Sequence, residues 1–146
     1  MEIKQIEYNS KEYINSVNLR NKILRIPLGL FLDINKLEKE KSDIHIAAFE
    51  KNKIIGILIL TPIDTAIVKM RQVAIDTGLQ NKGIGSMLVE FSEKIAWDLK
   101  FSKIILDARS SAINFYLKMG YKILSDEYLD EHIKIPHYKM EKLLTL

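Results

Sequence analysis

The sequence predicts an α/β domain with a mixed sheet, and three observations point to it. A β-prone run over residues 65–75 leads into the glycine-containing stretch 80–86, and apolar residues then recur at helical spacing to Ile95. A short apolar run at 104–106 follows that helix and completes a β-α-β unit. Two further β-prone runs flank Lys51-Asn52, which is typical of a hairpin. These patterns together predict one parallel strand pair within a mostly antiparallel sheet.

The N-terminal third is expected to hold one strand and two helices. Residues 2–8 alternate weakly in polarity and are interpreted as an edge strand. Asn9 and Glu12 have the spacing of a capping pair for a helix that Pro27 must end. A second, short and charged helix is predicted over residues 33–41, with an aspartate as its cap.

The remaining elements follow in order, and no linker or composition shift separates them, so residues 1–146 are expected to form a single domain. We predict seven strands and about four helices in all. Beyond those already named, the expected strands are 44–50, 53–60, 121–124 and 138–143, and the expected helices are 83–100 and 112–119, with an acidic irregular loop over 125–137.

Bulk composition excludes several function classes. The chain has 146 residues, a formal charge of +3 and no cysteine, so disulfide frameworks and thiol nucleophiles are absent. The small charge and the lack of a Lys/Arg block argue against a nucleic-acid partner. The longest apolar run, residues 54–60, falls far below the ~20 residues of a membrane span. We expect a cytoplasmic protein with no membrane partner, and no metal, because the three histidines lack zinc-site spacing.

The stretch Gln80–Ser86 reads Gln-Asn-Lys-Gly-Ile-Gly-Ser and opens a helix directly after a strand. Backbone N–H groups at a helix N-terminus suit an anion, above all a phosphate. Gly83 and Gly85 are predicted to let a ligand approach the backbone. The stretch lacks the Gly-Lys-Ser/Thr of a P-loop and the third glycine of a Rossmann fingerprint. By itself a plain strand-to-helix turn would explain it equally well.

A second motif, Ala112-x-x-Phe-Tyr-x-Lys-x-Gly-Tyr121, follows one helix and one strand after Gln80-x-x-Gly-x-Gly85. The two motifs in this order resemble those of the GCN5-related N-acetyltransferase (GNAT) family. The resemblance covers nearly the whole chain and is loose only over residues 1–42. It implies a GNAT-like fold, acetyl-CoA or coenzyme A as the cofactor, and transfer of an acetyl group to an amine.

The resemblance also assigns the cofactor contacts. In the family the strand before the glycine loop pairs with pantetheine, and the loop amides hold the pyrophosphate. The corresponding cofactor-binding residues here are Val73, Ala74, Ile75, Gln80, Lys82, Gly83, Ile84, Gly85, Ser86, Met87 and Asn114. Arg109 stands where many members have Asn, which puts one cofactor hydrogen bond in doubt.

Tyr116 occupies the position of the family tyrosine that protonates the departing thiolate, so it is the candidate catalytic residue. The competing interpretation is an aromatic pair, Phe115 and Tyr116, on an amphipathic helix. The general base stays open among Glu131, His132, His137 and water.

The predicted function is transfer of an acetyl group to a primary amine of a small molecule by direct attack on the thioester. Two alternatives remain. One is a protein acetyltransferase acting on lysine or an N-terminus, and the other is a non-catalytic acyl-CoA-binding sensor. The sequence leaves the acceptor, the preferred acyl group and a homodimer open.

Overall fold

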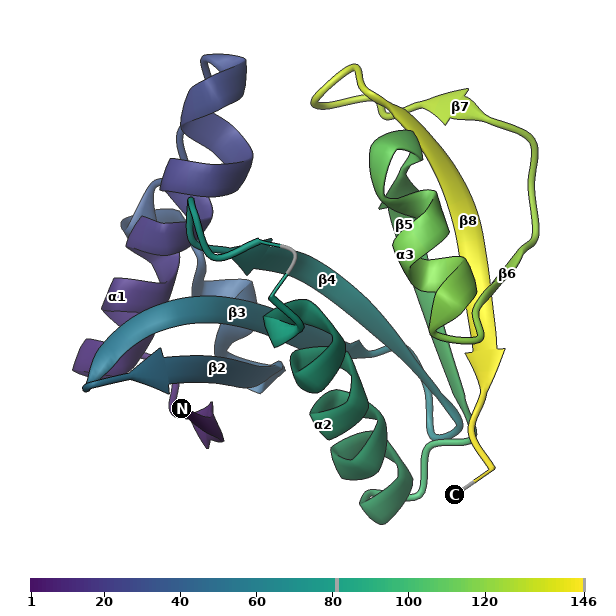
Figure 1. Cartoon of the computed structure of the whole chain (residues 1–146), viewed down its shortest axis with the longest axis horizontal. Helices are drawn as coiled ribbons and strands as arrows, with labels where there is room; N and C mark the ends of the chain where they lie inside the picture. The colour runs from purple at the N-terminus through teal and green to yellow at the C-terminus, as the bar shows by residue number, and fades with distance from the viewer. Residues whose placement is uncertain (81, 146) are drawn as a thin grey trace.

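The computed structural model describes residues 1–80 and 82–145, and its strands and helices follow the predicted order (Figure 1). The α-helices are α1 (Lys11–Arg20), α2 (Ile84–Asp98) and α3 (Ile113–Lys118). The strands are β1 (Glu2–Ile6), β2 (Ile44–Glu50), β3 (Lys53–Pro62), β4 (Ile67–Ile75), β5 (Lys103–Arg109), β6 (Lys122–Ile123), β7 (Tyr128–Leu129) and β8 (Pro136–Leu143). Within the described residues, no helix is long and apolar enough to cross a membrane.

The strands form one sheet in the order β1-β2-β3-β4-β5-β8-β6, with β7 paired to β8. Among the described residues, only β4 and β5 pair in parallel, as the β-α-β unit requires, and the other strand pairs are antiparallel. The predicted fold class is confirmed. The one addition is β7, a two-residue strand inside the loop that was expected to be irregular.

The predicted count of about four helices is slightly too high, because residues 33–41 form two short 3-10 turns, η3 (Ile34–Lys36) and η4 (Glu38–Ser42). Leu37 between them has φ −104° and ψ 23°, outside the helical region. The segment is charged and offers no apolar stripe that would hold a longer helix on the core.

The predicted cap of α1 is also wrong by one position. Asn9 has φ 63°, and Ser10 is the N-cap, with its Oγ accepting a hydrogen bond from the Tyr13 backbone N–H at 3.1 Å. The helix continues through a π-helical turn, η1 (Asn21–Arg25), and a 3-10 turn, η2 (Ile26–Leu28), that contains Pro27.

The two faces of the sheet carry separate helices. Alternate residues of the central strands pack on α1 and η1 from one face, with Leu19 and Ile57 in that cluster. The opposite face packs on α2 and α3 and includes Leu88 and Tyr116. Burial on both faces explains why β3 is apolar along nearly its whole length.

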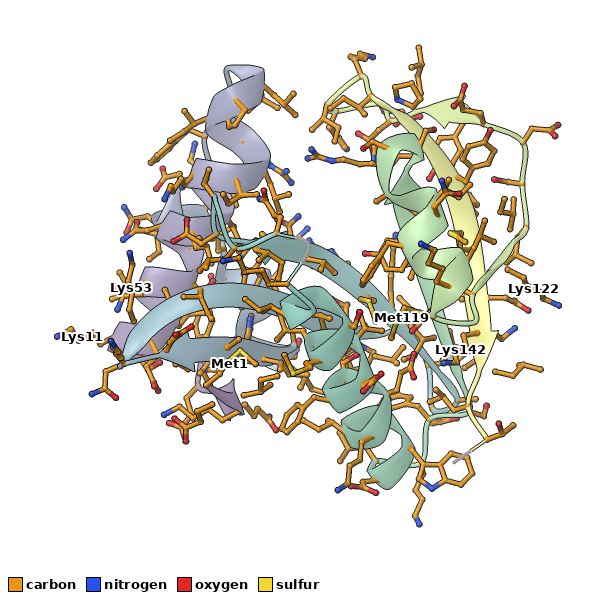
Figure 2. All side chains as sticks on the ribbon, in the orientation of Figure 1. Met1, Lys11, Lys53, Met119, Lys122 and Lys142 are labelled. Atoms are coloured by element: carbon orange, nitrogen blue, oxygen red, sulfur yellow. The ribbon has the colours of Figure 1, made fainter. Side chains whose placement is uncertain are left out.

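Three interactions hold the end of α3, the helix that carries the candidate catalytic tyrosine. Lys142 on β8 donates to the Met119 carbonyl at the end of α3 at 2.7 Å, and both side chains are labelled in Figure 2. The same ammonium pairs with Glu93 on α2 at 3.0 Å, and Glu93 also accepts from the Tyr121 hydroxyl at 2.9 Å. These contacts tie the end of α3 to α2 and β8.

Strand β4 separates from β5 part of the way along its length (Figure 1). Their parallel pairing ends at Met70 and Leu106, although β4 continues to Ile75. Next to this point, Gln72 and Val73 lie opposite the single residue Leu58 of β3, and Gln72 has φ 58°. Such a bulge bends a strand and increases its twist, so it explains why β4 turns away from its parallel neighbour.

Candidate functional site

A cavity of about 350 Å³ lies where β4 and β5 diverge. Its walls come from the two strands, from η1, from α3 with its preceding turn, and from the loop between β7 and β8. The lining side chains are Leu24, Arg25, Lys69, Met70, Arg71, Gln72, Val73, Leu106, Asp107, Ala108, Arg109, Ala112, Tyr116, Asp130, His132, Ile133 and His137. Segments from both ends of the chain therefore meet at one site.

The last residues of β4 present the predicted cofactor-binding strand. Val73 lines the cavity, while Ala74 is buried in the cluster under α1. Ala74 and Ile75 pair with β3, and neither has a partner on β5 within the described residues. The edge of β4 that faces β5 is thus left open here, which is the geometry that an extended ligand needs to add as a strand.

The glycine turn brings α2 to the same region. Gly83 has φ 83°, α2 begins at Ile84, and no side chain caps this N-terminus. A Cβ placed on Gly83 would meet no described atom within 4 Å, so the space beside it is open. Gly85 differs, because its Cβ would lie 3.4 Å from the Phe115 ring. The space beside the Gly85 Cα is thus bounded by α3, and contact of its backbone with a cofactor stays a prediction.

The other loop residues have mixed environments. Gln80 donates through its side-chain amide to the Ile75 carbonyl at 3.0 Å, which closes the turn after β4. Lys82 and Met87 are exposed, and Ser86 is half-buried. Asn81, inside the predicted motif, lies outside the described residues. Contact of these residues with a cofactor stays a prediction.

Tyr116 lies in the cavity wall and is 7% exposed. The rings of Phe115 and Tyr121 pack edge-on against it at centroid distances of 5.0 and 5.8 Å. Burial raises the pKa of Tyr116 to about 12. The Tyr116 hydroxyl makes no hydrogen bond to any described residue. Asn114, which is predicted to contact the cofactor, is exposed and does not line the cavity. The tyrosine thus offers a protonated hydroxyl to whatever occupies the cavity.

Two half-buried arginines form another wall. Arg25 ends η1 and Arg109 ends β5, and both donate to the Leu24 carbonyl, each at 3.2 Å. Burial lowers the pKa of both guanidinium groups, and the pKa of Arg25 is lowered further by the nearby charge of Arg109. Sequence patterns do not indicate that the two arginines lie close together, because 84 residues separate them along the chain.

The loop after β7 supplies the acidic and imidazole groups. Asp130 Oδ1 accepts from the backbone N–H groups of His132 and Ile133 at 2.8 and 2.9 Å, and these bonds lower the pKa of its carboxyl. His137 is buried, and its Nδ1 lies 2.6 Å from the Ile135 carbonyl. Because a carbonyl oxygen can only accept, Nδ1 carries the hydrogen and Nε2 has the free lone pair when the ring is neutral. Glu131 does not line the cavity.

Among residues 1–80 and 82–145, no group of three or more histidine or carboxylate side chains could hold a metal ion. The donors that line the cavity are guanidinium, ammonium, amide, hydroxyl and imidazole groups. These suit organic ligands with anionic and polar groups.

Comparison with known proteins gives a consistent result. Residues 10–121 match the acetyltransferase (GNAT) family. The chain is 32% identical over 111 residues to the uncharacterized N-acetyltransferase YjcF of Bacillus subtilis (strain 168), which covers 75% of this chain and 76% of that protein.

Solved structures share the architecture at low sequence identity. An aminoglycoside 6'-N-acetyltransferase complexed with coenzyme A has a TM-score of 0.83 at 17% identity, over 100% of this chain and 98% of that one. An acetyltransferase from Streptococcus agalactiae 2603 has a TM-score of 0.76 at 23% identity, over 98% of each chain. The fold expected from the two sequence motifs is confirmed.

Proposed function

Because the chain belongs to the GNAT acetyltransferase family, we propose that it transfers an acetyl group from acetyl-CoA to the primary amine of a small molecule. Acetyl-CoA is the cofactor of this family, and it supplies the acetyl group as a reactive thioester. The observation that carries the proposal is the cavity of about 350 Å³ whose lining includes both Val73, at the open edge of β4, and Tyr116. Residues 1–146 are treated as one N-acetyltransferase domain.

Two features of the chain suit the cofactor. The N-terminus of α2 has no side-chain cap, so the backbone N–H groups of Ile84–Met87 would hold its pyrophosphate, with Lys82 and Gln80 beside them. The open edge of Val73–Ile75 would pair with its pantetheine arm. Both features lie at the place where β4 leaves β5, which supports a single extended binding site.

Proton transfers fall to two side chains of the cavity. Burial raises the pKa of Tyr116 to about 12, so at neutral pH its hydroxyl carries the proton and can donate it to the departing sulfur. On the other wall, His137 Nε2 can accept the proton that the attacking amine loses. Amine and thioester would then react directly, and no residue of the chain would be acylated.

The shape of the cavity favours a small acceptor over a protein. Arg25 of η1 lines the cavity, and so do Asp130, His132 and Ile133 of the loop after β7. A lysine on a folded protein would have to reach past both segments. A protein acetyltransferase and a non-catalytic acyl-CoA sensor remain the competing proposals.

The test is release of free coenzyme A from acetyl-CoA in the presence of single amines. We expect turnover with at least one class of small primary amine and none with lysine-containing peptides. Mass spectrometry of the product must show acetylation at nitrogen. Tight coenzyme A binding without turnover on any small amine or peptide would instead support a sensor, and turnover confined to peptides would support a protein acetyltransferase.

A further inference from the structure

The charged side chains that line the cavity are not all paired within the protein. Lys69 forms a salt bridge with Asp107 at 2.7 Å, and Arg71 forms one with Asp43 at 3.6 Å. Arg25 and Arg109 form no salt bridge with any residue in the described part of the chain. They are the two arginines of this cavity that no described carboxylate pairs in a salt bridge.

The backbone holds these two guanidinium groups close together. Arg25 Nη1 and Arg109 Nη2 both donate to the Leu24 carbonyl at 3.2 Å, one from the end of η1 and the other from the end of β5. Like charges repel strongly when they are partly removed from water. Since each guanidinium has five N–H donors, most donors of the pair remain available to a ligand in the cavity.

Asp130 is the nearby acid, and it compensates this pair only in part. Its charge acts on both arginines, but its Oδ1 is engaged by the N–H groups of His132 and Ile133. Two positive charges thus face one negative charge in this corner. A ligand with one negative group would restore the balance.

We propose that the amine acceptor carries an anionic group, a carboxylate or a phosphate, which binds between Arg25 and Arg109. The planar fork of arginine matches the oxygens of either group, and the shared bond to the Leu24 carbonyl keeps the two guanidinium groups side by side in the cavity wall. The amine then extends along the cavity toward Val73 and Tyr116, which line its other part. This substrate class rests on the proposed acetyl transfer to a small amine.

The phosphates of the cofactor are not expected to bind between Arg25 and Arg109. Their expected site is the N-terminus of α2, and none of Ile84–Met87 lines the cavity that contains the arginines. The arginines therefore belong to the acceptor side of the site. This separation predicts that removing either arginine leaves coenzyme A affinity unchanged.

The experiment measures binding by calorimetry to the coenzyme A complex of the full chain, so it does not depend on turnover. β-Alanine is compared with β-alaninamide, and O-phosphoethanolamine with ethanolamine. We expect the anionic member of at least one pair to bind about ten- to a hundredfold tighter than its neutralised counterpart. The pair that shows this difference tells whether the arginines prefer a carboxylate or a phosphate. Arg25→Gln and Arg109→Gln should each abolish that preference.

Lys94→Gln is the matched control, because it removes one positive charge from an exposed position of α2 outside the cavity. The control should keep the full preference. Equal binding of both members in both pairs would overturn the proposal, as would a loss of coenzyme A affinity in either arginine variant. Turnover confined to neutral or cationic amines would also overturn it, yet would leave the proposed acetyltransferase function intact.

Discussion

Arg20 and Arg25 lie five residues apart on one helical stretch, α1 and η1, yet their environments are opposite. Arg20 is 1% exposed, and its Nη1 and Nη2 donate to the two carboxylate oxygens of Glu40 at 2.8 and 2.7 Å. Arg25 lies half-buried beside Arg109 and has no carboxylate partner among the described residues. The first arginine is neutralised by the fold, whereas the second faces a cavity.

The same contrast recurs in a tyrosine pair and in two helix N-termini. The hydroxyl of Tyr13 donates to Glu40 at 2.8 Å, whereas that of Tyr116 finds no acceptor in the described chain. Ser10 caps α1, whereas α2 begins after Gly83 with no side-chain cap. The Tyr116 hydroxyl and the first N–H groups of α2 are therefore donors that no side chain of the described residues uses, which leaves them available to a ligand.

The largest expected effect is a loss of turnover when Tyr116, but not Tyr13, is replaced by phenylalanine. Tyr116→Phe keeps the ring and its packing but removes the proton, so kcat and kcat/KM should fall together by ~10²–10⁴ while coenzyme A affinity stays nearly intact. The measurement is steady-state kinetics beside a coenzyme A titration. Tyr13→Phe is the matched control and should keep kcat while losing about 1–3 kcal/mol of stability. If Tyr116→Phe keeps the full kcat, the hydroxyl has no role in catalysis and the residue serves only to pack the core.

The arginine pair predicts a difference in stability. Arg20→Met leaves the Glu40 carboxylate buried without its partner, which should cost about 3–5 kcal/mol and lower Tm by roughly 10 °C. Arg25→Met removes a charge that lacks a carboxylate partner, so Tm should hardly change. Thermal unfolding of both variants in one buffer is the test. Equal losses would mean that Arg25 is structural too, which would weaken the case for an anionic acceptor.

The uncapped helix predicts a loss of cofactor affinity. Gly83→Asp places a negative charge at the N-terminus of α2, where the pyrophosphate is expected, and should cost about 2 kcal/mol of coenzyme A binding, roughly thirtyfold in Kd. Gly78→Asp is the control, because Gly78 has nearly the same φ, 82°, and equally open space. Both variants place an aspartate at a positive φ, so the backbone strain is similar in the two. If calorimetry gives the same coenzyme A affinity for both variants, the pyrophosphate does not bind at the N-terminus of α2.

The smallest effect concerns alkaline pH. Burial raises the pKa of Tyr116 to about 12, and burial together with the Glu40 bond raises that of Tyr13. Above about pH 10 the unfolded chain releases these protons and the folded chain keeps them, so the free energy of unfolding falls as pH rises toward 12. Urea unfolding at several pH values above neutrality should give a shallower decline in either Tyr→Phe variant. An unchanged slope in both would contradict their raised pKa values.

Much of the fold could be predicted from local sequence. Alternation, helical spacing and the glycine turn placed β2 to β5, α2 and α3, because these signals arise from neighbours along the chain. The charged segment 33–41 was misjudged, since a capping aspartate alone cannot hold a helix with no apolar face. The closeness of Phe115 to Gly85 could not be predicted, because the two residues lie on different helices that only packing brings together.

By itself the sequence determined the order of the elements, the strand–glycine–helix unit around Gly83 and the position of Tyr116 on α3. These depend on residue types at short spacings, which fix backbone conformation and the face that each helix buries. Only the tertiary structure decided that Arg25 and Arg109 share the Leu24 carbonyl, and that Arg20 has a carboxylate partner while Arg25 has none. The environment of a charge depends on groups brought together by packing, and spacing along the chain carries no record of it.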